Sequence, residues 1–354
     1  MPESQRRLAF RQACRMKWSV LDQSTAAEGS TQDAAIRESL ALARLCDTLG
    51  YHRYWVSEHH NSASIVGTAP EILIAAIAAT TRRIRVGSAG VMLPHYSPLK
   101  VAEQFRVLEA IAPGRIDLGV GRAPGSDQLT ARALNPYSNA ADEFPQQVVE
   151  LQSWLAGAPL PEDHPFRSVA AHPQGPTSPE LWILGSSDYG AQLAAYFGLP
   201  YAFAYFFSDG RGVEEALALY RRNYRPSARY PAPIATICVW ALAAETRAEA
   251  QRLLMSREYW RIGFEKGLRN PLVSPAQAAA YPYNAEERAR IEALRGKAFV
   301  GTADEVAARL ETLARRLDLN EIVINTWTHD PEARQRSYTL LAAAFGLDGS
   351  AAAS

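Results

Sequence analysis

Short runs of β-branched and aromatic residues alternate along the chain with segments whose apolar residues recur at helical spacing. This order predicts parallel strands with helices packed outside them. Eight strand-like runs are present, and a closed barrel is the arrangement that eight such units describe. The chain has 354 residues, whereas a plain barrel needs about 250, so insertions are expected in the loops at the C-terminal face. The sequence therefore predicts an α/β protein, a (β/α)8 TIM barrel with insertions.

The strands are predicted where β-branched runs are bounded by turn residues. They cover residues 18–22, 53–57, 84–92, 116–120, 181–184, 201–207, 236–243 and 321–326. Helices are predicted at 31–49, 70–81, 98–111, 189–197, 212–224, 246–262 and 302–317. Gly50 closes the first of these helices, and Thr302 followed by Glu305 is an N-terminal capping pattern for the last.

The expected organisation is one barrel domain over residues 16–347, with insertions at about 124–180 and 263–296. Loops at the C-terminal ends of barrel strands build the active site of this fold, so we interpret both insertions as pocket walls or lids. Residues 1–15 are expected to be a disordered extension and 348–354 a flexible tail.

Composition excludes several functional classes. Lys and Arg together number 37 and balance 37 Asp and Glu, so neither nucleic acid nor a membrane surface is an expected partner. The three cysteines, Cys14, Cys46 and Cys238, are too scattered for a disulfide framework or a cysteine-rich zinc site. The N-terminal residues lack the apolar core of a signal peptide, and a cytoplasmic protein is expected.

Glu58, His59, His60 and Asn61 follow the second predicted strand, where side chains should point into the barrel mouth. Histidine there suits proton transfer or metal ligation. Adjacent strand residues face opposite sides, so only one of the two histidines is expected to face the mouth, and no metal site is expected. The alternative is a histidine that only holds the loop through hydrogen bonds.

Small residues end the third strand at 86–94, and they permit a flat ligand to approach the backbone. The alternative is a bulge needed only for barrel closure. The fourth strand ends with Arg122 between glycines, a guanidinium that suits a phosphate or, alternatively, a carboxylate partner such as Glu58.

Gly185, Ser186 and Ser187 follow the fifth strand and precede a predicted helix, so free amides and hydroxyls gather at a positive dipole end. An ordinary helix cap explains the same residues. Taken together with Arg122, these residues predict a site for one phosphate, with room for an attached ring system beside the small-residue strand.

These motifs in combination resemble those of the bacterial luciferase-like flavin monooxygenases, in a non-luminescent branch. The resemblance covers roughly residues 16–346 and is carried by 58–60, 86–94, 97–103, 113–122, 183–187, 301–306 and 326–330. It implies a two-component enzyme, in which a separate reductase supplies reduced FMN (FMNH2), and a flavin C4a-hydroperoxide formed with O2 oxygenates the substrate. It also implies a cis peptide between Ala89 and Gly90, and a homodimer.

The resemblance assigns site residues one by one. His59 matches the active-site histidine. The residues expected to bind the cofactor are Glu58, Ser88, Ala89, Gly90, Arg122, Gly185, Ser186, Ser187 and Gly190. Gly121 stands where the luminescent subunit has a reactive cysteine, and Gly190 stands where relatives have a hydroxyl at the phosphate. Light emission is therefore not expected.

The substrate is expected to be a small organic molecule, apolar or aromatic. The aromatic residues Tyr137, Trp182, Tyr201, Phe203, Tyr205 and Trp240 would suit it, although each could equally fill the barrel core. The alternatives are an oxidoreductase of the same superfamily that uses the deazaflavin F420, a non-catalytic flavin-binding protein, and a metal-dependent barrel hydrolase.

Overall fold

The computed structural model describes residues 16–136 and 140–349. Strands within these ranges are β1 (Lys17–Asp22), β2 (Arg53–Val56), β3 (Arg85–Met92), β4 (Ile116–Gly121), β5 (Glu180–Gly185), β6 (Tyr201–Phe203), β7 (Ala235–Ala244), β8 (Phe299–Thr302) and β9 (Glu321–Asn325). The helices are α2 (Gln32–Leu49), α3 (Pro70–Thr80), η1 (Leu93–His95), α4 (Pro98–Ile111), α5 (Gln128–Leu134), α6 (Ala140–Ala156), α7 (Asp188–Phe197), α8 (Tyr205–Ser208), α9 (Val213–Asn223), α10 (Arg247–Glu265), α11 (Pro275–Ala280), α12 (Ala285–Arg295), α13 (Ala303–Arg316) and α14 (Pro331–Ala344).

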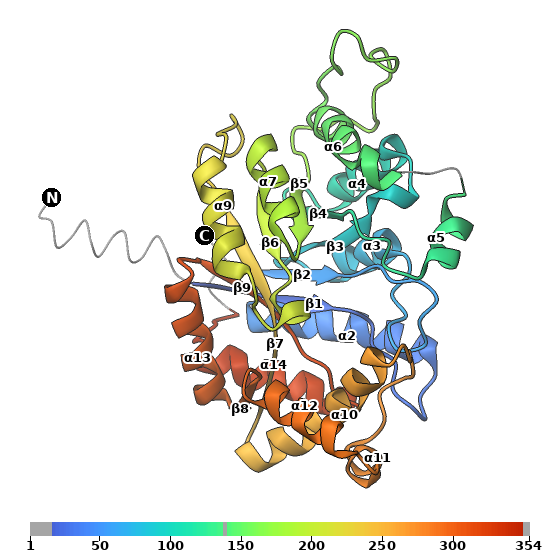
Figure 1. The fold of residues 1–354 in the computed structure, drawn as a ribbon. Helices are drawn as coiled ribbons and strands as arrows, with labels where there is room; N and C mark the ends of the chain where they lie inside the picture. The colour runs from blue at the N-terminus through green and yellow to red at the C-terminus, as the bar shows by residue number, and fades with distance from the viewer. Residues whose placement is uncertain (1–15, 137–139, 350–354) are drawn as a thin grey trace, which may run out of the picture.

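The strands form a closed barrel. From β1 to β6 each strand pairs with the next, β6 pairs with β7, β7 with β9, and β9 with β1, all in parallel. Eight strands of the described residues thus make the ring, and helices surround it (Figure 1). The predicted (β/α)8 TIM barrel is confirmed. No helix in residues 16–136 or 140–349 is long and apolar enough to cross a membrane.

Two strand predictions need correction. The predicted strand 201–207 ends at Phe203, because the chain turns there into the short helix α8. Strand β8 was not predicted, since it is four residues long and contains a glycine. It pairs with Ala241–Ala244, the far end of β7, outside the ring. The capping predictions hold, because Gly50 ends α2 with φ +87° and Glu305 accepts a hydrogen bond from the Thr302 amide at the start of α13.

The segments expected as insertions contain helices. Residues 124–180 include α5 and α6, and residues 263–296 include α11 and α12, which lie beside α10 (Figure 1). The proposed extension at 1–15 lies outside the described residues, and so do residues 350–354 of the proposed tail.

Apolar side chains of the described residues form three clusters, of which one packs around α10 and the end of β7, and the other two lie on the two faces of the barrel strands. The larger lies between the outer faces of the strands and the helices, and it includes Tyr201 and Phe203. The smaller fills the inside of the barrel, where Trp182 packs edge-on against Trp55 with ring centroids 5.2 Å apart. Each such buried side chain contributes about 1.5–3 kcal/mol. A packed interior means that a ligand must enter from one end of the barrel.

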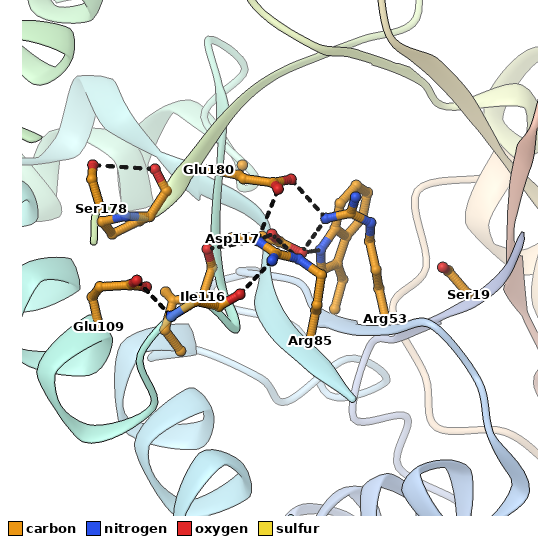
Figure 2. Close-up of polar contacts among 12 residues, drawn as sticks. Ser19, Arg53, Arg85, Glu109, Ile116, Asp117, Ser178 and Glu180 are labelled. Atoms are coloured by element: carbon orange, nitrogen blue, oxygen red, sulfur yellow. Dashed lines mark hydrogen bonds and ion pairs between the residues drawn. The ribbon is translucent and has the colours of Figure 1, made fainter. Parts of the chain in front are cut away.

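The N-terminal end of the barrel is filled by charges. Arg53 of β2 contacts Asp117 at 2.8 Å and Glu180 at 3.0 Å, and Arg85 also contacts Asp117, at 2.5 Å (Figure 2). Arg53 contacts Glu321 as well, at 2.9 Å. Burial alone would raise the pKa of the Asp117 carboxyl, but the two guanidinium groups outweigh burial and hold that pKa below its usual value. This network closes one end of the barrel and leaves the opposite end for chemistry.

Candidate functional site

A cavity of about 270 Å³ opens at the C-terminal ends of the strands, and we call it the barrel-mouth cavity. Residues at the ends of β1 to β7 and in the turns after them line it. The predicted site residues on its wall are His59, Ala89, Gly90, Arg122, Gly185, Ser186, Ser187 and Gly190. Motifs far apart in the sequence therefore meet at one place.

One end of this cavity is suited to an anion. The Arg122 guanidinium lies 4.1 Å above the Tyr189 ring and has neither an ion pair nor a hydrogen bond with any residue that the structure describes. Ser187 is the N-cap of α7, yet its side chain makes no capping hydrogen bond. The hydroxyl, the guanidinium and the positive end of the helix dipole are all available to a ligand.

The glycines on this wall also have a packing role. A Cβ on Gly190 would lie 3.2 Å from the Cα of Gly185, so the two glycines let α7 approach β5 closely. The hydroxyl-bearing residue expected at position 190 from the resemblance is thus replaced by a glycine that fits a tight helix–strand contact.

The small-residue strand β3 shows both features that the sequence left open. Its pairing with β4 shifts register between Ala89 and Val91, which is the bulge expected as the alternative. Ala89 and Gly90 nevertheless line the cavity, and the peptide between them is cis, as expected. A Cβ on Gly90 would lie 2.3 Å from the Leu184 side chain, so no larger residue fits there.

Glu58 and Ser88 do not line the cavity. The buried Glu58 carboxylate accepts hydrogen bonds from the Tyr96 hydroxyl at 2.7 Å and the Met92 amide at 3.0 Å, and contacts His60 Nε2 at 2.8 Å. Ser88 is hydrogen-bonded to the main chain of β4 at 2.9 and 3.1 Å. Both residues hold the loops around the cavity in place. Glu58 does not pair with Arg122, which was the alternative considered from the sequence.

Of the two histidines, only His59 lines the barrel-mouth cavity, although strand alternation is not the reason, because β2 already ends at Val56. Both His59 and His60 line a second, outer cavity, and His59 lines the barrel-mouth cavity as well. His59 Nδ1 lies 3.1 Å from the Ser57 hydroxyl, and Nε2 has no hydrogen-bond partner in the described residues. Burial lowers the pKa of His59 to about 4, so the ring is neutral at pH 7 and can accept a proton.

The outer cavity has a volume of about 600 Å³ and shares Gln23, Phe206 and Phe207 with the barrel-mouth cavity. Its walls come from residues 123–127, from α10 and the loop after it, and from the end of β9. The contribution of α10 was not predicted, because its amphipathic spacing looks like that of any barrel helix. Across residues 16–136 and 140–349, no group of three or more His, Cys, Asp or Glu side chains is arranged to hold a metal ion.

The aromatic residues proposed for the substrate separate into several groups. Trp240 lines the outer cavity and Phe203 the barrel-mouth cavity, whereas Trp182 and Tyr201 are buried in the core. Tyr205 packs near Phe299 instead, and Tyr137 lies outside the described residues.

Acid should destabilise the fold through two half-buried histidines, His52 and His59. Burial lowers the pKa of both His52 and His59 to about 4, while in the unfolded chain a histidine titrates near about 6.5. Between these values the unfolded state binds more protons, so this stability is complete above pH about 6.5 and is lost as the pH falls toward 4. Urea unfolding at pH 7 and pH 5 measures the effect. The free energy of unfolding should fall less between pH 7 and pH 5 in His52→Gln and in His59→Gln than in the wild type. An unchanged fall in both variants would contradict the assignment of this acid sensitivity to the two histidines.

Comparison with known proteins assigns the family. Residues 16–319 match the family model described as luciferase-like monooxygenase. The chain is 41% identical over 324 residues to a luciferase-like monooxygenase of Escherichia coli strain K12, covering 91% of this chain and 95% of that protein. It is 38% identical over 331 residues to the N-acetyl-S-alkylcysteine monooxygenase of Bacillus subtilis strain 168, covering 92% and 97%. The crystal structure of apo-MsnO8 shares 37% identity with a TM-score of 0.85, over 95% of this chain and 99% of that one. The chain therefore belongs to the luciferase-like monooxygenase family.

More distant structures with this fold differ in their cofactor. The oxygenating constituent of 3,6-diketocamphane monooxygenase from Pseudomonas putida, in complex with FMN, is 19% identical, with a TM-score of 0.68 over 93% of this chain and 97% of that one. An F420-dependent secondary alcohol dehydrogenase in complex with an F420-acetone adduct is 13% identical, with a TM-score of 0.68 over 93% and 99%. These two proteins thus share the fold and bind FMN and F420, respectively.

Proposed function

We propose that this chain is a flavin-dependent monooxygenase, which uses O2 and reduced FMN from a separate reductase to oxygenate a small organic substrate. One observation carries the proposal. An unpaired guanidinium and the N-terminus of α7 meet on one wall of the barrel-mouth cavity, while His59 stands where that cavity adjoins the outer one.

The residues present fit FMN. Arg122 offers a planar donor fork that matches a phosphate, and Ser186 and Ser187 add hydroxyls and amides at the positive end of α7. Ala89 and Gly90 leave a slot for a flat ring system beside β3. Bound reduced flavin would supply the electrons that activate dioxygen.

The other residues shelter and position the reactants. The neutral His59 presents Nε2, which can take or return a proton at the boundary of the two cavities. Residues 123–127, the end of α10 and the loop after it enclose the outer cavity, where the substrate is placed and from which water must be excluded.

Arg122→Ala tests the phosphate site. Loss of a charge-assisted hydrogen bond of about 1.5–3 kcal/mol should weaken FMN binding by about 10- to 100-fold, measured by flavin fluorescence titration. Riboflavin, which lacks the phosphate, should bind the wild type and the variant equally well. Arg132→Ala removes an exposed arginine on α5, outside both cavities, and should leave FMN affinity unchanged.

Two results of the same titration would count against the proposal. Equal FMN affinity in the wild type and Arg122→Ala would show that Arg122 does not bind the FMN phosphate. Tighter binding of F420 than of FMN by the wild type would favour the deazaflavin oxidoreductase instead.

A further inference from the structure

The outer cavity carries an excess of positive charge. Within the part of the chain that the structure describes, its charged lining residues are Arg257, Arg261 and Arg269 against the single carboxylate of Asp127. Asp127 is already engaged as the N-cap of α5, where it accepts a hydrogen bond from the Thr130 amide at 3.0 Å. A ligand that enters this cavity therefore meets more positive than negative charge on its walls.

Arg257 is the least compensated of these arginines. Its guanidinium lies 4.1 Å above the ring of Trp240, a contact that uses one face and leaves the N–H edges free. No hydrogen bond or ion pair joins it to any described residue. Burial, with Arg261 nearby, lowers the pKa of Arg257 to about 9, so the group remains charged at neutral pH.

Elsewhere the protein compensates its enclosed arginines. Arg334 contacts Asp22 at 3.2 Å, and Arg106 donates to three main-chain carbonyl oxygens, the nearest at 2.5 Å. In the outer cavity, Arg261 contacts Glu265 at 2.8 Å. An enclosed cation without a partner is costly, and the cost is removed when a ligand supplies the anion.

The carboxylates near Arg257 do not fill this role. Glu258, the next residue on α10, is bound at 2.6 and 2.8 Å by Arg295. Asp209 interacts with Arg257 electrostatically, but the two side chains are too far apart to form an ion pair. The N–H edges of Arg257 thus remain available to a ligand in the cavity.

We propose that Arg257 binds the carboxylate of the substrate, and that the outer cavity accepts an organic acid with an apolar body. A single planar guanidinium fork matches one carboxylate, and the rings of Trp240, Trp260, Phe264 and Trp327 form an apolar wall around it. The proposal rests on the proposed function, because it assigns the substrate class of the same monooxygenase.

The test compares two acids with their uncharged methyl esters. Decanoate and naphthalene-2-acetate, each with its ester, are titrated calorimetrically into the full chain without flavin at pH 7. Wild type should bind at least one acid more tightly than its ester. Arg257→Met keeps an unbranched side chain as long as the arginine stem but removes the guanidinium, and it should weaken acid binding by about 10- to 100-fold, with ester binding unchanged. Arg257→Lys should retain part of the preference.

Arg261→Met is the matched control on the same helix face, and it should cause a much smaller loss because Glu265 already neutralises Arg261. Equal binding of acid and ester by the wild type, no binding of either acid at millimolar concentration, or an unchanged acid affinity in a folded Arg257→Met would each overturn the proposal. Since no flavin is present, these results are independent of whether FMN binds. Conversely, Arg257→Met should bind FMN like the wild type, so failure of the flavin site is detected separately.

Discussion

Replacement of His59 by alanine is expected to lower the rate of substrate oxygenation by about 10²- to 10⁴-fold, the usual contribution of a positioned acid–base group. The lowered pKa keeps this ring neutral at pH 7, and Nδ1 contacts the Ser57 hydroxyl, so in the proposed function Nε2 is the atom that would exchange the proton. Without it, more of the O2 consumed should leave as hydrogen peroxide. The measurement is product formed and peroxide released per O2 consumed, with reduced FMN supplied by a reductase.

His164→Ala is the control for this experiment. His164 contacts Glu150 at 3.1 Å and lines neither cavity, so coupling between O2 consumption and product should be unaffected. A His59→Ala protein that still binds FMN and still forms product without extra peroxide would show that His59 only holds its loop, the alternative raised from the sequence.

Arg53→Met is expected to destabilise the fold by about 3–5 kcal/mol, the range for removing one partner of a buried ion pair. Arg53 is 5% exposed and joins Asp117, Glu180 and Glu321 at the closed end of the barrel. Without it, Glu321 loses the ion pair that the described residues give it, and Asp117 and Glu180 share the single guanidinium of Arg85. The free energy of unfolding in urea at pH 7 measures the loss.

The pH dependence of the free energy of unfolding shows whether Arg53→Met is destabilised by unpaired carboxylates or by the loss of side-chain packing. Protonation of the stranded carboxylates relieves their repulsion, so the gap between Arg53→Met and wild type should narrow as the pH is lowered. Arg252→Met is the control, because Arg252 and Glu249 form an exposed pair that contributes at most about 1 kcal/mol. Comparable losses in the two variants would show that the Arg53 network contributes no more than a surface pair.

Local patterns were sufficient for most of the barrel. Buried parallel strands are short apolar runs, so all eight ring strands were recognisable, and Gly50 and Thr302 marked helix ends through their own backbone chemistry. Helix α6 was not predicted, since Pro145 lies inside it, and neither was α14, although Asp330 caps it before a proline. Neither segment carried enough local sequence signals for its helix to be predicted.

The site was predictable only where a motif stands at a strand end. Arg122 and Ser187 were found because their positions follow strands directly, and the barrel then brings them to one cavity. The role of Glu58 depends on Tyr96 and Met92, which no spacing rule connects to it. Arg257 left no signal, because an arginine on an amphipathic helix becomes unusual only when the folded chain leaves it without a partner.

The position of β9 in the ring constrains how the chain can fold during translation. Strand β9, from Glu321 onward, inserts between β7 and β1, and the Ser19 hydroxyl donates to Glu321 across a separation of 302 residues. The ribosome must therefore synthesise almost the whole domain before β1 obtains its second neighbour. Until then β1 has an open strand edge, and such distant pairings form slowly, so the ring can close only after its last strand has been synthesised.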